Sequence, residues 1–188
     1  IARHEREIFP LMHRRYLFSG TDSFLRYDFY APDGHVNDDV FAYSNHHGDE
    51  RSLVIYHNRY ASARGWVRLS AAFSARTGRG DERALTQRTL AEGLGLQAGN
   101  DNYTIFRDHR SGLEYIRHSR ELAENGLYVE LAAYDCHVFV DIREVRDSAD
   151  GRYGQIARFL NGRGIPSIDI ALREMFLQPV LTPFRELL

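Results

Sequence analysis

Residues 40–57, VFAYSNHHGDERSLVIYH, contain two runs rich in β-branched and aromatic residues with a polar segment between them. Residues 40–44 and 53–57 have the composition of strands. The polar residues 46–51 between them are typical of the tip of an antiparallel hairpin. The second run is nearly all apolar, which predicts a central strand with both faces buried. The fold is therefore expected to be built around this hairpin.

Further strand-like segments lie on both sides of the hairpin. The strands expected there cover residues 24–30, 66–69, 103–106, 113–116, 127–131 and 137–142. A turn at 32–34 ends the first of them, and residues 108–112 connect a second hairpin. About eight strands joined locally, with helices in separate blocks, indicate a mainly β fold with helical additions. We interpret this as an antiparallel β-sandwich.

Apolar residues recur at helical spacing in five other segments. The predicted helices cover residues 2–17, 82–94, 119–125, 153–160 and 168–176. Pro10 interrupts the first. Asp81 is the expected N-cap of the second helix, in which Leu85, Leu90 and Leu94 recur, and residues 74–80 before it are expected to form a loop.

Composition excludes several classes of protein. A chain of 188 residues is long enough for one well-packed domain, and its single cysteine excludes an internal disulfide framework. The net charge of −2 supplies no broad positive field, so no nucleic-acid partner is expected. No apolar run reaches the roughly 20 residues of a membrane helix, so no membrane partner is expected either. All 24 basic residues are arginine, which excludes lysine Schiff-base and P-loop chemistry.

Two groups of residues have the chemistry of metal ligands. His46 and His47 lie near Asp49, but adjacent residues on a strand point in opposite directions, so a hairpin tip is the favoured interpretation. A second group could offer oxygen atoms to calcium, although its order does not match an EF-hand loop and turn or cap roles are favoured. This group consists of Asp33, Asn37, Asp38 and Asp39. No metal and no cofactor are therefore predicted.

The sequence evidence for a catalytic site is as weak as that for a metal site. Cys136 precedes His137, yet neighbours on one strand face opposite sides, and a free cysteine is most often a small buried hydrophobic residue. Asp108 and Asp141 supply a carboxylate pair for a hydrolase only if the two groups converge, and solvated ion pairs with arginine are the favoured alternative. The segment 162–164, GRG, is too short to be a dinucleotide fingerprint. No catalytic residue is assigned from the sequence.

Aromatic residues give one candidate binding surface. Trp66, with Tyr60 and Tyr56 close to it in the sequence, could stack against the apolar faces of sugar rings. Packing of Trp66 in the core is the alternative interpretation. These three residues are the candidate carbohydrate contacts.

Four segments in the first third of the chain resemble the junction between the barrel and the C-terminal domain of bacterial α-amylase-family glycoside hydrolases. They are residues 13–18 (HRRYLF), 24–29 (FLRYDF), 39–45 (DVFAYSN) and 52–60 (SLVIYHNRY). Their order, a last barrel helix followed by a strand and a hairpin, is the order found in that family. The resemblance implies an antiparallel β-sandwich that packs on a catalytic (β/α)₈ barrel.

This resemblance also implies a division of the chain and a role. Residues 1–20 would be the remnant helix of the preceding barrel or linker, and residues 21–188 the C-terminal β-sandwich domain with helical insertions. The family's catalytic acids lie on barrel strands, which this chain lacks, and residues 45–47 (NHH) have histidine where the family's Asn-His-Asp segment has aspartate.

The first hypothesis is therefore a non-catalytic accessory domain of an amylase-like glycoside hydrolase of carbohydrate metabolism, whose partner is the catalytic barrel of the same full-length chain. The alternatives are a carbohydrate-binding module for an α-glucan, which would use Trp66 and its neighbouring tyrosines, and an independent enzyme with a carboxylate pair.

Overall fold

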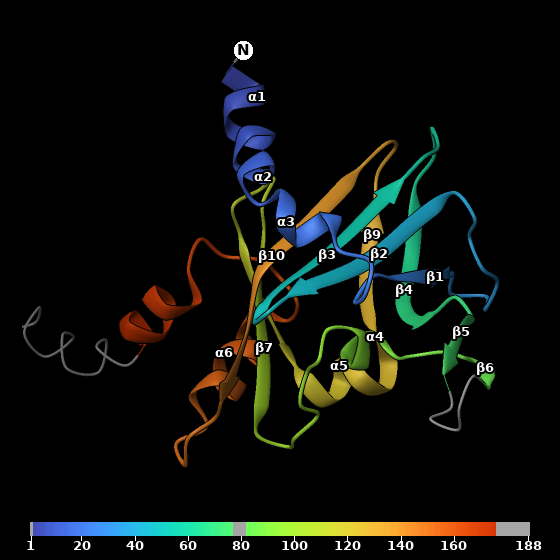
Figure 1. Cartoon of the computed structure of the whole chain (residues 1–188). Helices are drawn as coiled ribbons and strands as arrows, with labels where there is room; N and C mark the ends of the chain where they lie inside the picture. The colour runs from blue at the N-terminus through green and yellow to red at the C-terminus, as the bar shows by residue number, and fades with distance from the viewer. Residues whose placement is uncertain (1, 77–81, 176–188) are drawn as a thin grey trace, which may run out of the picture.

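The computed structural model describes residues 2–76 and 82–175, and its main element is one antiparallel sheet of eight strands (Figure 1). The strand order is β8-β7-β10-β3-β2-β1-β4-β9. The strands of this sheet are β1 (Leu25–Tyr30), β2 (Val40–His47), β3 (Glu50–His57), β4 (Ala63–Ser70), β7 (Asn102–Asp108), β8 (Glu114–His118), β9 (Leu127–Leu131) and β10 (Cys136–Arg146). A separate two-stranded ribbon consists of β5 (Phe73–Arg76) and β6 (Arg83–Thr86).

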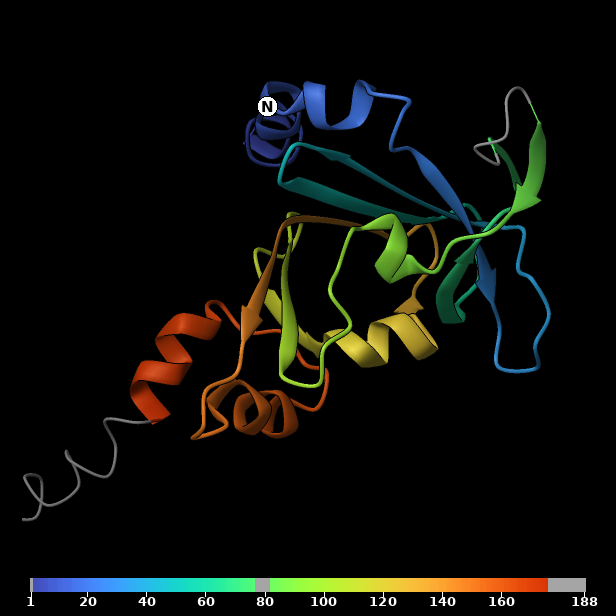
Figure 2. The same cartoon turned by 60° about the horizontal axis from the view of Figure 1, so that its bottom comes forward.

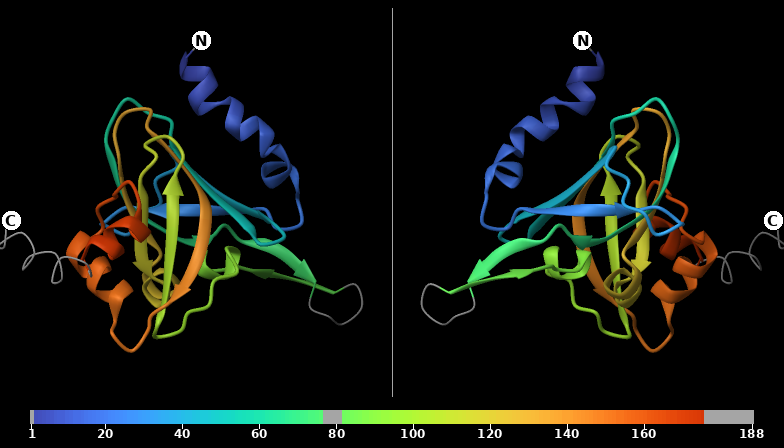
Figure 3. Two further views of the ribbon diagram at one scale, coloured as in Figure 1. Left: turned by 90° about the vertical axis from the view of Figure 1, so that its left-hand side faces the viewer. Right: turned by 90° about the vertical axis from the view of Figure 1, so that its right-hand side faces the viewer.

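The sheet is strongly curved, as both views in Figure 3 show. Strands β8 and β9 are its two edges, yet only the seven-residue helix α5 (Ser119–Asn125) and Gly126 separate them in the chain. A helix of this length spans about 10 Å, so the edges must approach each other. The prediction of a mainly β, antiparallel, sandwich-like fold with helical additions is confirmed.

The main hydrophobic core fills the concave side of this sheet. It includes Tyr27 and Phe29 of β1, Ile55 of β3, and Phe139 of β10. Helices α4 (Leu90–Gly93) and α5 lie together beside it (Figure 2), and Leu90 and Leu122 close the core there. Strand β3 occupies the centre of the sheet and its residues 52–55 are buried, as the apolar run predicts.

A second core lies on the opposite face of the β7–β8–β10 part of the sheet. Helix α6 (Arg152–Leu160) and the helical residues 168–175 cover that face, and Figure 3 shows them on the outer side of the sheet, far from the β5–β6 ribbon. Ile105 and Ile116 from the strands pack against Ile156, Leu160 and Ile168. Both predicted C-terminal helices are present as far as the structure describes them.

The predicted helix over residues 2–17 is divided into three short helices. They are α1 (Ala2–Glu7), α2 (Phe9–His13) and α3 (Arg15–Ser19). Pro10 lies at the start of α2 and has no backbone N–H to donate to the preceding turn, which explains the break at Ile8. None of the helices in residues 2–76 and 82–175 has the length and hydropathy needed to cross a membrane.

The predicted helix over residues 82–94 is wrong for most of its length. Residues 83–86 instead form β6, which pairs with β5, so the preceding segment is also partly strand where a loop was expected. Leu85 is 79% exposed, whereas Leu90 is buried in the core. The helix starts only at α4, where Thr89 and Glu92 form a capping box. Asp81, the predicted cap, lies outside the described residues.

The central hairpin is longer than predicted. Most of the expected polar tip is strand, since β2 extends to His47 and β3 begins at Glu50. The connection is the two-residue turn Gly48–Asp49, in which Gly48 has a φ of 59°. A residue with positive φ at this position is typical of tight hairpin turns.

Helices α1 and α2 extend away from the end of the sheet (Figure 1). Two side-chain contacts fix the adjoining segment to the sheet: Arg14 pairs with Asp141 at 2.6 Å, and the Tyr16 hydroxyl donates to Glu50 at 2.7 Å. Nε2 of His109 also lies 3.0 Å from the backbone oxygen of Glu7. The helices are therefore attached to the sheet along one side.

Candidate functional site

Three aromatic residues lie next to one another across the outer face of the sheet. Tyr30 of β1 pairs in register with Trp66 of β4, and Trp66 pairs with Tyr128 of β9. Side chains of directly opposed residues share one face of a sheet, and the neighbours Phe29 and Val67 point into the core. We call Tyr30, Trp66 and Tyr128 the outer aromatic row.

Trp66 is held in place by Tyr128. Their ring centroids are 5.0 Å apart and the ring planes are inclined by 57°. The Tyr128 hydroxyl donates a hydrogen bond to Glu130, two residues along the same strand, at 2.8 Å. These contacts fix the Trp66 indole before any ligand is present, which reduces the entropy lost on binding.

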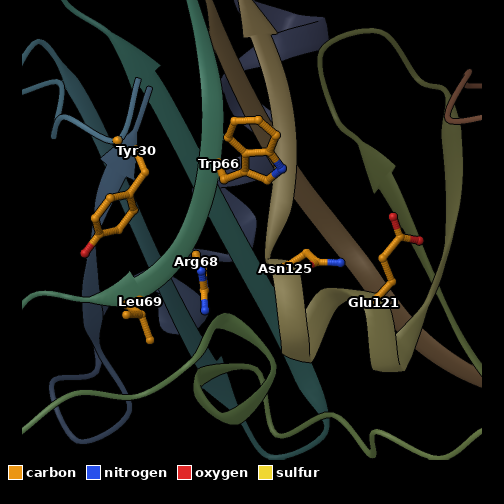
Figure 4. Close-up of a pocket in the computed structure, with 7 residues that line it drawn as sticks. Tyr30, Trp66, Arg68, Leu69, Glu121 and Asn125 are labelled. Carbon is orange, nitrogen blue, oxygen red and sulfur yellow. The ribbon is translucent and has the colours of Figure 1, made fainter. Parts of the chain in front are cut away.

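A pocket of about 490 Å³ opens beside Trp66. Figure 4 shows Tyr30 and Trp66 on one side of this pocket, Arg68 and Leu69 below them, and Asn125 and Glu121 of α5 on the other side. Helix α5 is placed there because its buried face, which includes Leu122, closes the main core and leaves Glu121 and Asn125 outside. We call this the outer pocket.

The polar groups of the outer pocket are free to bind a ligand. Among the described residues, the side chains of Tyr30, Arg68, Glu121 and Asn125 form no hydrogen bond or ion pair with the protein. Arg68 can only donate hydrogen bonds, Glu121 accepts them when ionised, and Asn125 can do both. With the faces of Trp66 and Tyr30, they suit a neutral ligand that carries many hydroxyl groups on an apolar ring.

The structure does not bring the three predicted carbohydrate contacts together. Trp66 lines the outer pocket, whereas Tyr60 and Tyr56 are not among its lining residues. Tyr60 lies beyond the end of β3, is 84% exposed and contacts Tyr134 at a centroid distance of 6.3 Å. Tyr56 is on β3, and its hydroxyl donates to Asn58 at 3.2 Å.

Sequence reasoning missed the other members of the site. The alternation in residues 127–131, LYVEL, places Tyr128 and Glu130 together on one face of a strand and could have marked Tyr128 as outward-facing. The pairing of Tyr30 with Trp66 depends on the register between β1 and β4, which the local pattern does not contain.

The predicted metal-type residues have other contacts. The His47 ring packs edge-on against Tyr16, with centroids 5.4 Å apart. In the turn after β1, the Asn37 side chain accepts the backbone N–H of Asp39, and Asp39 pairs with Arg59 at 2.7 Å. Within residues 2–76 and 82–175, no group of three or more His, Cys, Asp or Glu side chains is arranged to hold a metal ion.

Asp108 and Asp141 have separate partners. The buried carboxylate of Asp108 accepts hydrogen bonds from the Ser111 hydroxyl at 2.8 Å and from the Val138 backbone N–H at 3.2 Å, with His137 Nδ1 at 3.4 Å. Burial acts to raise the pKa of Asp108, but the bonds from His137 and Ser111 outweigh it and lower the pKa to about 2. Asp141 instead pairs with Arg14.

Cys136 lies at the start of β10 and is partly buried. Burial raises the pKa of its thiol, which disfavours the thiolate needed for nucleophilic attack. The neighbouring His137 is directed to Asp108. The order Cys136–His137 in the sequence therefore does not form a thiol–base pair.

No family model matches the chain, and no curated protein or solved structure matches it either. The features of this chain that bear on its function are therefore the outer aromatic row, the pockets and the resemblance in residues 13–60.

Proposed function

We propose that this chain is a non-catalytic accessory domain of an amylase-like glycoside hydrolase and that its outer pocket binds an α-glucan. The observation that carries the proposal is the position of Trp66, which is fixed by Tyr128 and lies beside unpaired polar side chains. The resemblance of residues 13–60 to the amylase family supplies the class of sugar.

The chemistry of the outer pocket supports a sugar ligand in two ways. A pyranose has an apolar face formed by its C–H groups, and this face stacks on an indole or phenol ring. Its hydroxyl groups both donate and accept hydrogen bonds, which matches Arg68 and Glu121 on either side of the pocket. The volume lies in the range of sites that hold small ligands.

Replacing Trp66 by Ala is expected to weaken the binding of maltoheptaose about tenfold or more, because a loss of about 1.4 kcal/mol in stacking and apolar burial is already a factor of ten. Isothermal titration calorimetry measures this change directly. Tyr60→Ala is the matched control, since Tyr60 is an exposed aromatic residue that does not line the pocket. Equal affinities of Trp66→Ala and the unmodified chain, or no binding at millimolar maltoheptaose, would contradict the proposal.

A second function is the docking of the domain on a catalytic barrel, which is the first hypothesis from the sequence. It is supported by the apolar side chains that α1 and α2 leave exposed. Ile8, Phe9 and Met12 are 44%, 49% and 63% exposed and follow one another along the same segment. Clustered apolar side chains on a protein surface are typical of interaction sites.

If the domain docks on a catalytic barrel that carries the activity, the chain alone is expected to release no reducing sugar from starch or maltooligosaccharides. The double variant Phe9→Ser/Met12→Ser is expected to reduce the fluorescence of an apolar dye such as anilinonaphthalene sulfonate, because it removes the exposed patch. Phe41→Ser, which changes an exposed aromatic on β2, is the control. Starch turnover by the chain, or unchanged dye binding in the double variant, would count against docking.

A further inference from the structure

A second pocket lies where the curved sheet fails to close. It has a volume of about 380 Å³ and is lined by residues of the two edge strands, by the ends of β7 and β10, and by the loop after α6. Strands β8 and β9 stand at opposite ends of the strand order and do not pair. We call this space the edge pocket.

The wall formed by β8 and the loop carries positive charge. Arg117 of β8 donates hydrogen bonds only to backbone oxygens, those of Ile116 at 2.9 Å and Gly162 at 3.0 Å. Its guanidinium lies 6.0 Å from the centre of the Phe106 ring. Arg163 of the loop also donates only to backbone oxygens and lines the same pocket.

Arg117 differs from comparable arginines of this protein. The other arginines described as partly buried all form ion pairs with carboxylates, namely Arg14, Arg51, Arg107 and Arg143. Within the described part of the chain, Arg117 has no carboxylate within ion-pair distance, although the Glu121 carboxylate, which lies beyond that distance, partly stabilises its charge. Burial lowers the pKa of its guanidinium, which reflects the cost of holding this charge away from water. An anion in the pocket would offset that cost.

The opposite wall and the floor have different chemistry. On β9, the Glu130 carboxylate accepts the Tyr128 hydroxyl and faces the same pocket. A carboxylate at this end disfavours a second anionic group and accepts hydrogen bonds from hydroxyls. The floor is aromatic: Phe106 and Tyr115 stack at 5.8 Å with their planes 13° apart, and Phe139 packs edge-on against both.

We propose that the edge pocket binds an acidic monosaccharide, a hydroxylated six-membered ring that carries one carboxylate or phosphate group. The anionic group pairs with Arg117 and Arg163, because the planar guanidinium fork matches both kinds of oxyanion. The ring lies over the aromatic floor, and its hydroxyls donate to Glu130.

His137 supplies a further polar group. Its ring stacks on Phe139, with centroids 5.3 Å apart and planes 9° apart. Because the Asp108 carboxylate is ionised and can only accept, Nδ1 of His137 is the donor in their contact. Nε2 of His137 has no hydrogen-bond partner among the described residues, and the side chain lines the pocket. It can therefore contact the ligand directly.

Calorimetric titration with glucose 6-phosphate, glucuronate, inorganic phosphate and neutral glucose tests this proposal. Either or both of the two acidic sugars are expected to bind, and comparison of the two identifies a phosphate or a carboxylate as the preferred group. Neutral glucose is expected to bind at least tenfold more weakly than the better acidic sugar, since it lacks the charge-assisted hydrogen bonds. Failure of both acidic sugars to bind at millimolar concentration would overturn the proposal, as would inorganic phosphate binding as tightly as glucose 6-phosphate.

Arg117→Gln is expected to weaken the binding of the better acidic sugar about tenfold or more, and Arg163→Gln by a smaller factor because Arg163 is exposed. Arg26→Gln, an exposed arginine on β1 that does not line the pocket, is the matched control and should bind within about twofold of the unmodified chain. Circular dichroism verifies that each variant is folded. A folded Arg117→Gln variant with unchanged affinity would contradict the assignment.

Binding measurements test the acidic-sugar site in the edge pocket and the proposed α-glucan site in the outer pocket independently. Arg68→Gln should leave the binding of acidic sugars unchanged, since Arg68 lines the outer pocket and not the edge pocket. Arg163→Gln should likewise leave the binding of maltoheptaose unchanged, since Arg163 lines the edge pocket and not the outer pocket. Loss of acidic-sugar binding in Arg68→Gln would show that one site takes both ligands and would overturn the separate edge pocket.

Discussion

Replacing Glu114 by Gln is expected to lower the free energy of unfolding by about 3 kcal/mol, near the lower end of the range for removing one partner of a buried ion pair. The Glu114 side chain is 4% exposed, and its carboxylate accepts Arg107 Nη2 at 2.7 Å and Arg143 Nη1 at 3.1 Å. It also accepts the backbone N–H of Ile168 at 2.8 Å. The lower end of the range applies because both arginine side chains are 37% exposed.

The size of this effect follows from what Glu114 connects. It joins β8 to β7 through Arg107, to β10 through Arg143, and to the C-terminal helical residues 168–175 through Ile168. Burial alone would raise the pKa of Glu114, but the backbone N–H of Ile168 and the two arginines lower it, so the group is ionised at neutral pH.

Urea unfolding followed by circular dichroism measures the loss of stability. Glu124→Gln is the matched control, because Glu124 pairs with Arg120 at 2.8 Å on α5 with both side chains more than half exposed. An exposed pair of this kind contributes about 0.3–0.5 kcal/mol. Similar losses in both variants would show that Glu114 has no special role in holding the strands and the C-terminal helix together.

The second large effect is expected from Gly126→Ala, which should destabilise the protein by about 3 kcal/mol or more. Gly126 connects α5 to β9 with φ 77° and ψ −166°, a backbone conformation that is essentially restricted to glycine. A Cβ atom there would lie 2.3 Å from the backbone oxygen of Val67 and 2.7 Å from Cα of Arg68. Backbone strain of about 1–2 kcal/mol and overpacking of about 1–3 kcal/mol therefore add.

Gly112→Ala separates these two contributions. Gly112 also has a positive φ, 72°, but a Cβ at this position would meet no atom within 4 Å. Its substitution should cost only the backbone strain, about 1–2 kcal/mol. Thermal unfolding of the two variants gives the difference, and a Gly112→Ala variant as unstable as Gly126→Ala would show that the contact with β4 does not matter.

Much of the fold could be predicted because its strands are locally encoded. Residues 127–131 form β9 with the predicted bounds, since alternation marks the strand and Gly126, which ends the preceding helix, marks its start. In residues 82–94, three leucines recur at helical spacing and predict a helix. In the structure, pairing of residues 83–86 with β5 takes precedence over that local pattern, and Leu85 remains exposed.

The candidate site could be predicted only in part, for a related reason. Trp66 was recognised from its residue type alone, whereas its true neighbours Tyr30 and Tyr128 come from strands about 36 and 62 residues away in the sequence and are aligned by strand register. Tyr60 and Tyr56 are close to Trp66 in the sequence, but Tyr56 lies on β3, which β2 and β1 separate from β4, and Tyr60 lies beyond the end of β3. Arg117 could not be identified because the absence of a partner is a property of the folded state.

The two edge strands of the sheet do not pair with each other, which has a consequence for how this protein could diversify. In a fully closed barrel, the hydrogen-bonded ladder fixes the distance between every pair of strands. Here the separation of β8 and β9 is instead determined by α5 and by the side chains between the two strands. Substitutions of those side chains can therefore widen or narrow the edge pocket while the pairing of the eight strands stays intact.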